Sequence, residues 1–353
     1  MKLTRTADRR ALSPRRRLLV VAAASTAALV AISLGAGTTS AFAAGSGKGF
    51  TIAFVPKQLN NPYTNVELGG GKKAAKSLGD TYSVVGPNTA SASSQVSYIN
   101  TLTQKHTDVI AIAANDPNAV CSALNQAKSA GAKIITFDSD TKKSCRSLFI
   151  NQVKAKDVAL IELKQMAEQI NDEGDIAILS ATANATNQNS WIKYMKAELA
   201  SNPAYSKIKL VTTVYGNDDD TTSFQAAQGL MQSYPNLKGI ISPTTVGIAA
   251  TARYLSTSSY KGKVILTGLG LPNQMRQYVK DGTVKEFALW DPAKIGQATV
   301  YAAKALKAGT ITGKTGDKFK AGSLGTLKVG KDNTVIVGGP TAFDAANIDK
   351  YNF

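Results

Sequence analysis

From residue 50 onward, short apolar runs alternate with longer stretches whose apolar residues recur every three or four positions. The short runs predict strands and the longer stretches predict helices. In the first part of the chain the predicted strands are Phe50–Val55, Tyr82–Val85, Val109–Ala113, Lys133–Phe137 and Ser147–Ile150, and the predicted helices are Pro62–Leu78, Gln95–Gln104 and Asn118–Ala130. In the second part the predicted strands are Asp175–Leu179, Ile208–Tyr215, Gly239–Ile241, Val264–Thr267 and Val284–Leu289, and the predicted helices are Lys156–Ile170, Gln188–Leu199, Thr222–Ser233, Val246–Leu255 and Pro272–Lys280.

This alternation of strand and helix predicts an α/β protein with parallel sheets covered on both faces. The run Val109–Ala113 has no polar residue, as expected for a strand buried on both sides. Each set of elements spans about 110 to 140 residues, the size of one domain. The fold class we predict is therefore two doubly wound parallel-sheet lobes.

The chain is expected to cross between the two lobes more than once. A further helix is predicted at Ile295–Leu306, and we expect crossings near Asn151, near Leu289 and around Lys320–Lys328. The predicted divisions are 48–151 (N-terminal lobe), 152–288 (C-terminal lobe), 289–325 (return to the N-terminal lobe) and 326–353 (tail crossing the hinge again). A hinge of several strands allows closure about a cleft.

Residues 1–43 have the pattern of a secretory signal peptide. Basic residues at Arg15–Arg17 precede an uncharged apolar run, Leu18–Leu34, and Ala41–Ala43 fits an Ala-x-Ala cleavage site. We therefore expect an exported protein, periplasmic or extracellular. The apolar run is also long enough for an uncleaved membrane anchor.

The chain has a formal net charge of +17, but its lysines are scattered. Lysines are not interleaved with aromatic residues, and no helix-turn-helix pattern is present, so we expect no nucleic-acid partner. A solvated, lysine-rich surface is the simpler interpretation.

The only two cysteines, Cys121 and Cys145, each follow a predicted strand of neighbouring βα units. They should lie near the same edge of the sheet, and export permits a disulfide, so we predict that they pair. Two buried free thiols are the alternative. Two sulfurs and the single His106 do not make a zinc site, and we expect no metal.

The segment Phe54–Tyr63 carries the first candidate site residues. Its strand ends at Pro56, and Lys57, Asn61 and Tyr63 follow before the next helix. Open α/β sheets bind ligands at the carboxyl ends of their strands. A surface turn rich in Asn and Pro is the alternative interpretation.

Further polar and aromatic residues follow other strands at the same edge of each predicted sheet. Carboxylates and amides between them accept from and donate to hydroxyl groups, and aromatic faces suit the C–H side of a sugar ring. The arrangement therefore predicts a site for a polyhydroxylated small molecule. Its candidate residues are Lys57, Asn61, Tyr63, Asp138, Asn187, Gln188, Pro243, Thr245, Trp290 and Asp291, with Trp191 a weaker candidate.

Each candidate also has an ordinary structural interpretation. Asp138 and Asp140 are typical helix-capping residues, and Asn187 is a candidate N-cap for the helix bearing Trp191. Trp191 has the spacing of a core residue. Pro243 and Thr245 fit an ordinary turn.

Other motifs do not support catalysis or cofactor binding. Gly69–Lys73 lacks the spacing of a phosphate loop and falls inside a predicted helix. Asp218–Asp220 lacks the spacing of a calcium loop and fits a cap for the helix at Thr222. We find no nucleophile elbow or nucleotide fingerprint, and expect no enzyme activity and no cofactor.

The stretch from about Phe50 to Phe353 resembles the sugar-type periplasmic binding proteins of ABC importers, within the rhamnose-binding and autoinducer-2-binding branch. The stretches that carry the resemblance are Phe54–Lys57, Gln95-Val96, Ile99-Asn100, Phe137–Thr141, Asn187–Asn189 with Trp191, Ser242-Pro243, Pro272–Arg276 and Gly282–Asp291. The resemblance implies a type I periplasmic binding protein fold and a hinge between lobes.

The resemblance also implies site residues. Autoinducer-2 receptors use a lysine and an aspartate that match Lys57 and Asp138, an Asp-Gln pair where this chain has Asn187-Gln188, and a proline and alanine where it has Pro243 and Thr245. The Asn and Thr depart from that pattern and fit rhamnose-type receptors. The Asn60–Tyr63 loop resembles the sugar-contacting loop of ribose-type receptors.

We therefore expect an exported, monomeric solute-binding protein that captures a monosaccharide, rhamnose first, and delivers it to a membrane permease. An autoinducer-2 receptor is the alternative within the family. A doubly wound enzyme and a sugar-responsive repressor are alternatives of other classes, and the repressor needs a DNA-binding headpiece where this chain has its signal-peptide pattern.

Overall fold

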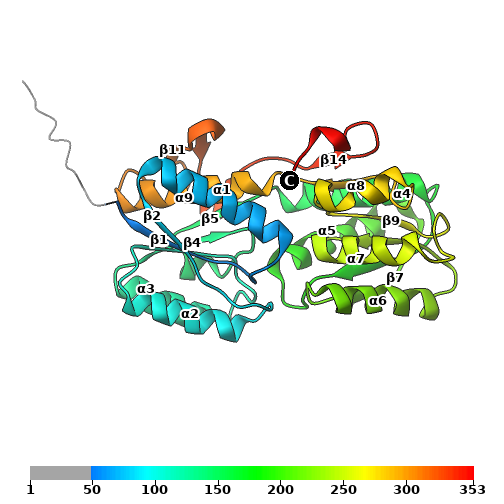
Figure 1. Ribbon diagram of the computed structural model, residues 1–353, viewed down its shortest axis with the longest axis horizontal. Helices are drawn as coiled ribbons and strands as arrows, with labels where there is room; N and C mark the ends of the chain where they lie inside the picture. Colours follow the sequence, from blue (N-terminus) through cyan, green and yellow to red (C-terminus); the bar gives the residue numbers. More distant parts are fainter. Residues whose placement is uncertain (1–48) are drawn as a thin grey trace, which may run out of the picture. The chain divides into compact units, whose positions relative to one another are not determined.

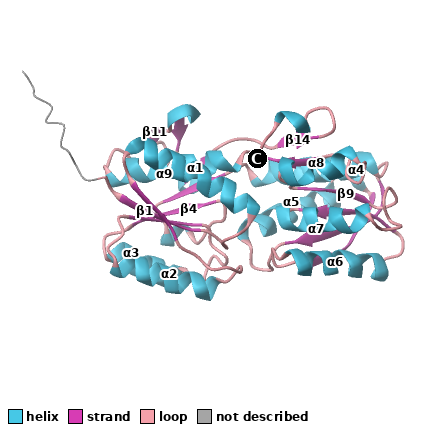
Figure 2. Cartoon of the chain, viewed as in Figure 1, coloured by secondary structure: helices cyan, strands magenta, loops and turns pink. Residues whose placement is uncertain are grey.

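Two parallel β-sheets, each covered by helices, form the main body of the computed structural model, which describes residues 49–353 (Figure 1, Figure 2). The predicted signal peptide, residues 1–43, lies outside the described residues. The sheets confirm the α/β class and the parallel strand arrangement that the alternation of elements predicts.

The first sheet has six strands in the order β13-β5-β4-β3-β1-β2, and every pairing in it is parallel. Its strands are β1 (Thr51–Val55), β2 (Thr81–Val84), β3 (Val109–Ile112), β4 (Lys133–Phe137), β5 (Leu148–Asn151) and β13 (Thr334–Ile336). Its helices are α1 (Pro62–Leu78), α2 (Ala92–Gln104), α3 (Cys121–Ser129) and α9 (Pro292–Lys307).

The side chains of β1 show why this sheet is covered on both faces. Ile52 and Phe54 join one hydrophobic cluster, and Ala53 and Val55 join another that includes residues of α2 and α3. Successive side chains of a strand point to opposite faces, so one apolar run supplies both cores. Figure 1 shows α2 and α3 on one side of the sheet and α1 and α9 on the other.

The second sheet has four parallel strands in the order β7-β6-β8-β9. Its strands are β6 (Glu173–Ser180), β7 (Lys207–Tyr215), β8 (Leu237–Ser242) and β9 (Ile265–Gly268). Its helices are α4 (Ala155–Gln169), α5 (Thr186–Ser201), α6 (Asp220–Ser233), α7 (Thr245–Ser256) and α8 (Pro272–Lys280). Helix α4 packs on α5, and α6 packs on α7. We call the two sheets with their helices the first and second lobes.

Helices α1 and α9 cross at two glycines. A Cβ atom on Gly70 of α1 would lie 2.0 Å from the Ala293 carbonyl oxygen, and one on Gly296 of α9 would lie 1.9 Å from the Glu67 carbonyl oxygen. Contacts this short exclude any side chain. The glycine run that superficially resembles a phosphate loop therefore lies in a helix, where Gly70 permits close packing.

Three segments connect the lobes. The first follows β5, and the second follows β10 (Phe287–Leu289) and leads into α9. The third lies between β13 and β14 (Thr341–Phe343), because β13 pairs with β5 while β14 pairs with β10. This third crossing is later than the expected 320–328, since residues 334–336 still belong to the first sheet. The predicted lobe boundaries otherwise stay a prediction.

The segment predicted as the last strand of the second sheet is also placed differently. Strand β10 pairs antiparallel with β14. Its pairing with the second sheet is limited to an isolated bridge between Ala288 and Leu269, the residue that follows β9. The remaining elements are an antiparallel hairpin, β11 (Lys318–Lys320) with β12 (Thr326–Lys328), and five short 3-10 turns: Lys143–Cys145, Pro203–Tyr205, Gly322–Leu324, Lys331–Asn333 and Ile348–Lys350.

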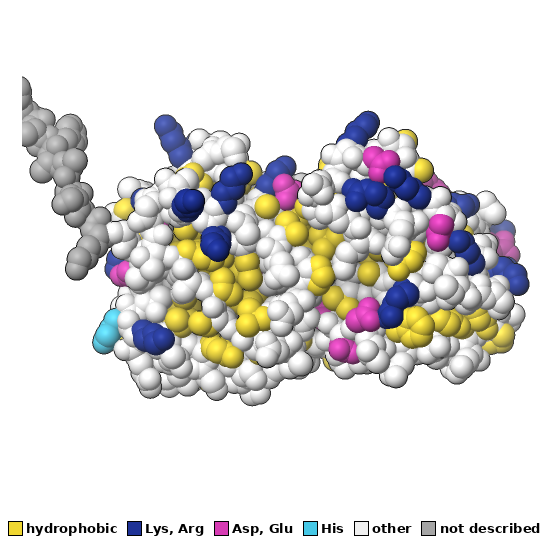
Figure 3. Space-filling model, in the orientation of Figure 1, with side chains coloured by type: hydrophobic (Ala, Val, Ile, Leu, Met, Phe, Trp, Pro, Cys, Tyr) yellow, Lys and Arg dark blue, Asp and Glu magenta, His cyan; other side chains and the backbone are white. Residues whose placement is uncertain are grey.

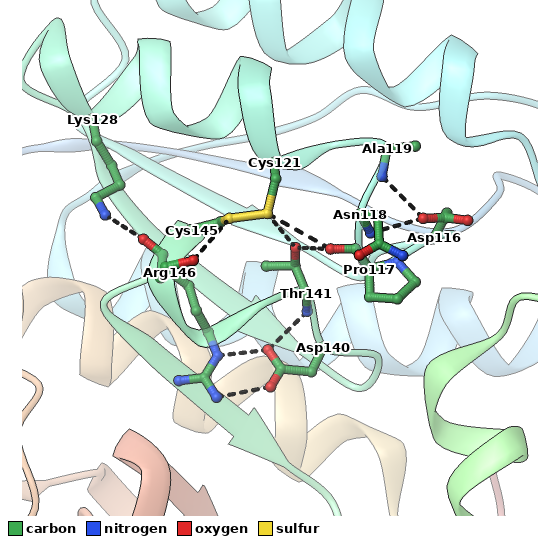
Figure 4. The surroundings of a disulfide bond; sticks show 11 residues. Asp116, Pro117, Asn118, Ala119, Cys121, Lys128, Asp140, Thr141, Cys145 and Arg146 are labelled. Atoms are coloured by element: carbon green, nitrogen blue, oxygen red, sulfur yellow. Dashed lines mark hydrogen bonds and ion pairs between the residues drawn. A yellow bond between two sulfur atoms is a disulfide. The ribbon is translucent and has the colours of Figure 1, made fainter.

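Cys121 at the start of α3 and Cys145 in the turn before β5 form a disulfide, which confirms the predicted pairing (Figure 4). Nearby, Thr141 donates its hydroxyl to the Pro117 carbonyl at 2.8 Å. Helix α3 begins at Cys121, later than the predicted Asn118, and Asp116 instead caps the preceding turn by accepting from two backbone N–H groups.

The surface of the described part carries dispersed basic side chains. On the face drawn in Figure 3, Lys and Arg side chains lie over both lobes and are not gathered in one patch. Within residues 49–353, no helix combines the length and the apolar character needed to cross a bilayer.

Candidate functional site

A cavity between the two lobes collects the ends of strands from both sheets. The first lobe contributes residues that follow β1 and β4 and part of α1, and the second lobe contributes residues that follow β6, β7 and β8. Its lining residues are Lys57, Asn61, Tyr63, Thr64, Glu67, Ala113, Asp138, Asn187, Gln188, Trp191, Asp218, Pro243, Thr244, Thr245, Leu269, Leu289 and Trp290. The cavity volume is about 40 Å³, enough for a few water molecules.

Lys57 reaches across this cavity from the first lobe to the second. It follows β1, and its ammonium group donates to Asn187 Oδ1 at 2.8 Å and to Gln188 Oε1 at 3.2 Å. Its backbone carbonyl accepts from the Asn115 side chain at 2.8 Å, which fixes the loop. The two amides lie in the first turn of α5, so their side chains point out of the helix end into the cavity.

Asp138 stands at the end of β4 in an unusual backbone conformation. Its φ is 56°, in the left-handed region, which aspartate tolerates better than most residues. Its carboxylate accepts from Tyr63 Oη at 3.0 Å and from Asn187 Nδ2 at 3.2 Å. The side chain of Lys57 lies 4.0 Å away. Strained residues of this kind concentrate at functional sites, where the surrounding structure holds them.

Burial and the neighbouring side chains shift the pKa of the Asp138 carboxyl in opposite directions. Removal from water raises the pKa of its carboxyl above the ordinary value, while Lys57 and the hydrogen bond from Tyr63 act in the opposite direction.

Aromatic side chains form one wall of the cavity. Trp290 donates its indole N–H to Tyr63 Oη at 2.8 Å, and Trp191 meets Trp290 edge-on with ring centroids 5.8 Å apart. Burial raises the pKa of the Tyr63 hydroxyl well above its usual value, and Asp138 adds to this. Trp191 is both a core residue and a lining residue, because it lies one helical turn after Asn187 on α5.

Three other candidates line the cavity and also shape the backbone. Asn61 is the N-cap of α1 and accepts from the Tyr63 and Thr64 N–H groups. Pro243 presents its carbonyl to the Gln188 side chain at 3.3 Å. Thr245, two residues after Pro243, begins α7. Ala185, rather than Asn187, is the N-cap of α5, which leaves the Asn187 side chain available to the cavity.

Two acidic residues considered in the sequence, the site candidate Asp291 and Asp140, have other partners. Asp291 is the N-cap of α9, where it accepts from the Ala293 N–H, and it does not line the cavity. Successive side chains after β10 point to opposite sides. The Trp290 side chain therefore points into the cavity, and the Asp291 side chain points toward the start of α9. Asp140 forms a two-pronged ion pair with Arg146, with N–O distances of 2.6 and 2.8 Å.

The structure also brings to the cavity residues that the sequence analysis did not select. Glu67 comes from the middle of α1, and Asp218 follows β7. Thr244, the N-cap of α7, hydrogen-bonds to Asp218 through its hydroxyl. Asp218, like Asp138, follows a predicted strand, so the expectation that ligands bind at strand ends could have identified it. Glu67 lies within a helix, and no sequence pattern marks it as a site residue. Asp219 caps α6, as predicted.

The arrangement suits reversible binding through hydrogen bonds. Both lobes contribute donors and acceptors to the cavity, beside apolar aromatic surfaces, and each lobe alone carries only part of the set. Within residues 49–353, no group of three His, Cys, Asp or Glu side chains is placed to hold a metal ion.

Comparison with known proteins places this architecture. Residues 52–311 match the family described as periplasmic binding protein domain. A sugar ABC transporter protein from Actinomyces odontolyticus is 61% identical, with a TM-score of 0.70 over 86% of this chain and 98% of that one. A solute-binding protein from Clostridium phytofermentas with bound L-rhamnose is 34% identical, with a TM-score of 0.83 over 86% of this chain and 98% of that one.

LsrB from Clostridium saccharobutylicum, in complex with AI-2 (autoinducer-2), is 25% identical, with a TM-score of 0.80 over 86% of this chain and 100% of that one. These matches extend over nearly all of the described residues and agree with the two-lobed parallel-sheet fold. The chain therefore belongs to the type I periplasmic binding proteins, as a sugar-binding protein of an ABC importer.

Proposed function

We propose that this protein captures L-rhamnose between its two lobes outside the cytoplasm and delivers it to the permease of an ABC importer. It acts as a monomer after removal of residues 1–43, and it makes and breaks no covalent bond. In this proposal Lys57, Asp138, Asn187 and Gln188 hold the sugar hydroxyls.

One observation carries the proposal. Lys57 and Asp138 of the first lobe and Asn187 of the second converge on one cavity, where they hydrogen-bond to one another. The cavity is smaller than a monosaccharide, so the sugar takes the place of some of these direct bonds. Both lobes can contact the sugar at the same time only when they are closed around it. Sugar binding therefore favours the closed state over the open state.

Two observations favour rhamnose among sugars. The relative with bound L-rhamnose is 34% identical over nearly its whole length. The cavity also has an apolar part, made by Trp191, Leu269 and Leu289, that suits the methyl group of a 6-deoxy sugar. A hydroxyl placed there would lose its hydrogen bonds with water, which costs free energy.

A second candidate ligand is autoinducer-2, since LsrB in complex with AI-2 has the same fold and is 25% identical. This ligand would meet Asn187 and Thr245 where autoinducer-2 receptors are expected to have an aspartate and an alanine. We place rhamnose first because these two substitutions alter the charge and the size of that wall.

The test is a calorimetric titration of the protein without residues 1–43. The ligands are L-rhamnose, autoinducer-2 and L-mannose, which differs from L-rhamnose only by a hydroxyl on the methyl group. We expect L-rhamnose to bind most tightly and L-mannose about tenfold or more weakly, because its extra hydroxyl is desolvated. If autoinducer-2 bound most tightly, the protein would be an autoinducer-2 receptor and the rhamnose proposal would be wrong.

A further inference from the structure

Glu67 is a buried carboxyl that lines the cavity without a partner. It lies on α1, one turn after Tyr63, and only 2% of its surface is exposed. Among the described residues, its Oε1 atom finds no hydrogen-bond partner. A buried acceptor left unpaired lowers stability, so its presence at a ligand cavity calls for an explanation.

The groups around Glu67 do not neutralise it. Lys57, the one cation that lines the cavity among residues 49–353, already donates to Asn187 and Gln188 and lies 4.0 Å from Asp138. One ammonium group therefore faces two carboxyls, and it is engaged elsewhere.

Within residues 49–353, the charged groups that shift the pKa of Glu67 are Asp138 and Lys57. An ionised Glu67 would raise the pKa of the Tyr63 hydroxyl on α1 and of the Tyr82 hydroxyl on β2. On the α9 side, Gly296 packs against the Glu67 backbone and carries no side chain. Asp218, across the cavity, is another acid.

These surroundings shift the pKa of Glu67 upward. Burial raises the pKa of its carboxyl well above the ordinary value, the neighbouring Asp138 raises it further, and Lys57 only partly opposes them. A carboxyl group that keeps its proton has an O–H donor as well as an acceptor.

We propose that Glu67 contacts the bound sugar directly as a neutral acid, donating a hydrogen bond to a sugar oxygen, and that it restricts the site to uncharged sugars. This inference rests on the proposed function and adds a specificity residue to it. Acidic sugars are rejected because a ligand carboxylate would face Glu67, Asp138 and Asp218 with only Lys57 to offset them. A purely structural role for Glu67 is the competing explanation.

The experiment compares Glu67→Leu, Glu67→Gln and wild type by calorimetry with L-rhamnose and by thermal melting without ligand. A contact role predicts that Glu67→Leu weakens rhamnose binding by about tenfold or more, the loss of at least one buried hydrogen bond, while its ligand-free melting temperature stays the same or rises. Glu67→Gln keeps an N–H donor of similar length, so it should lose less affinity than Glu67→Leu.

The pH profile supplies an independent readout. As the pH rises toward the raised pKa of Glu67, wild-type affinity should fall, because the donor proton is lost. Glu67→Gln has no such proton, and its profile should be flatter over the same range. Wild type should give no binding heat with D-galacturonate, an acidic sugar.

Several results would overturn the inference. Rhamnose binding by Glu67→Leu equal to that of wild type, or affinity lost in step with a lower ligand-free melting temperature, would assign Glu67 a structural role. If Glu67→Leu does not fold, identical pH profiles for wild type and Glu67→Gln would assign it that structural role as well. Binding of D-galacturonate would contradict the restriction to uncharged sugars. A wild type that binds no sugar at all would instead overturn the proposed function, and this inference with it.

Discussion

At the scale of single residues, the cavity concentrates polar groups in positions that are costly for the fold alone. Asp138 has a left-handed backbone and a buried carboxylate, and Glu67 has a buried acceptor without a partner. Burial of this kind lowers stability unless a binding partner uses it. Each of these residues therefore links the stability of the fold to its affinity for a ligand.

Asp138 gives the first prediction. Replacing it with alanine removes an acceptor that would take hydrogen bonds from sugar hydroxyls, each worth about 1.5–3 kcal/mol when the acceptor is charged. Asp138→Ala should therefore weaken L-rhamnose binding by about 10- to 100-fold in calorimetry. The matched control is Glu168→Ala, an exposed carboxylate on α4 paired with Lys164, which should bind as wild type does. Equal affinities for the two variants would show that Asp138 is not a ligand residue.

Glu162 gives a second prediction, which concerns stability. This residue of α4 is fully buried, and within residues 49–353 both of its carboxyl oxygens lack a hydrogen-bond partner. Burial raises the pKa of the group well above its ordinary value. The folded state then holds a proton that the unfolded chain releases at lower pH, so the free energy of unfolding falls as the pH rises from the unfolded pKa to the folded pKa.

Glu162→Met removes this group while keeping a similar apolar volume. The variant should exceed wild type in free energy of unfolding by about 1–3 kcal/mol at pH 7. The difference should shrink in urea unfolding at pH 3.5, where the unfolded glutamate, with an ordinary pKa of about 4.3, is also largely protonated. A variant that is less stable than wild type at pH 7, or a difference that does not change with pH, would contradict this account.

At the scale of elements, the strand ends do most of the work of positioning. β1, β4 and β8 all end at the same edge of their sheets, and the residues that follow them line the cavity. Lys57 and Asp138 could therefore be predicted from the sequence. Apolar runs mark where strands end, and the carboxyl ends of parallel strands lie at the same edge of a sheet.

Other features depended on contacts that no local pattern encodes. Glu67 lies on a helix whose amphipathic pattern gives no reason to place a carboxylate inward. Asp291 looked equivalent to Trp290, yet the first turn of α9 claims it as an N-cap. The third crossing was placed too early because the pairing of β13 with β5 joins residues far apart in sequence.

The disulfide between α3 and the turn before β5 gives a prediction at this scale. It closes a loop with a sequence separation of 24, and its loss should lower the free energy of unfolding by about 3 kcal/mol, mainly through greater freedom of the unfolded chain. Urea unfolding of Cys121→Ser/Cys145→Ser should show this loss, and a reductant should lower wild type to the same level. No effect of reductant on the double variant is the internal control, and an unchanged midpoint would contradict the prediction.

At the scale of the whole molecule, three chain crossings join two lobes that share one binding cavity. Direct hydrogen bonds from Lys57 to Asn187 and from Asn187 to Asp138 span the lobes, and a sugar would have to replace part of this set. Segments that connect two packed units in this way are suited to hinge closure. Capture by closure is therefore the central claim.

The most direct measurement is a crystal structure of the protein grown with L-rhamnose. The account predicts the sugar between the lobes, with its oxygens about 3 Å from the side chains of Lys57, Asp138 and Asn187. Rhamnose bound on the surface of one lobe, with those three side chains still bonded only to each other, would contradict it.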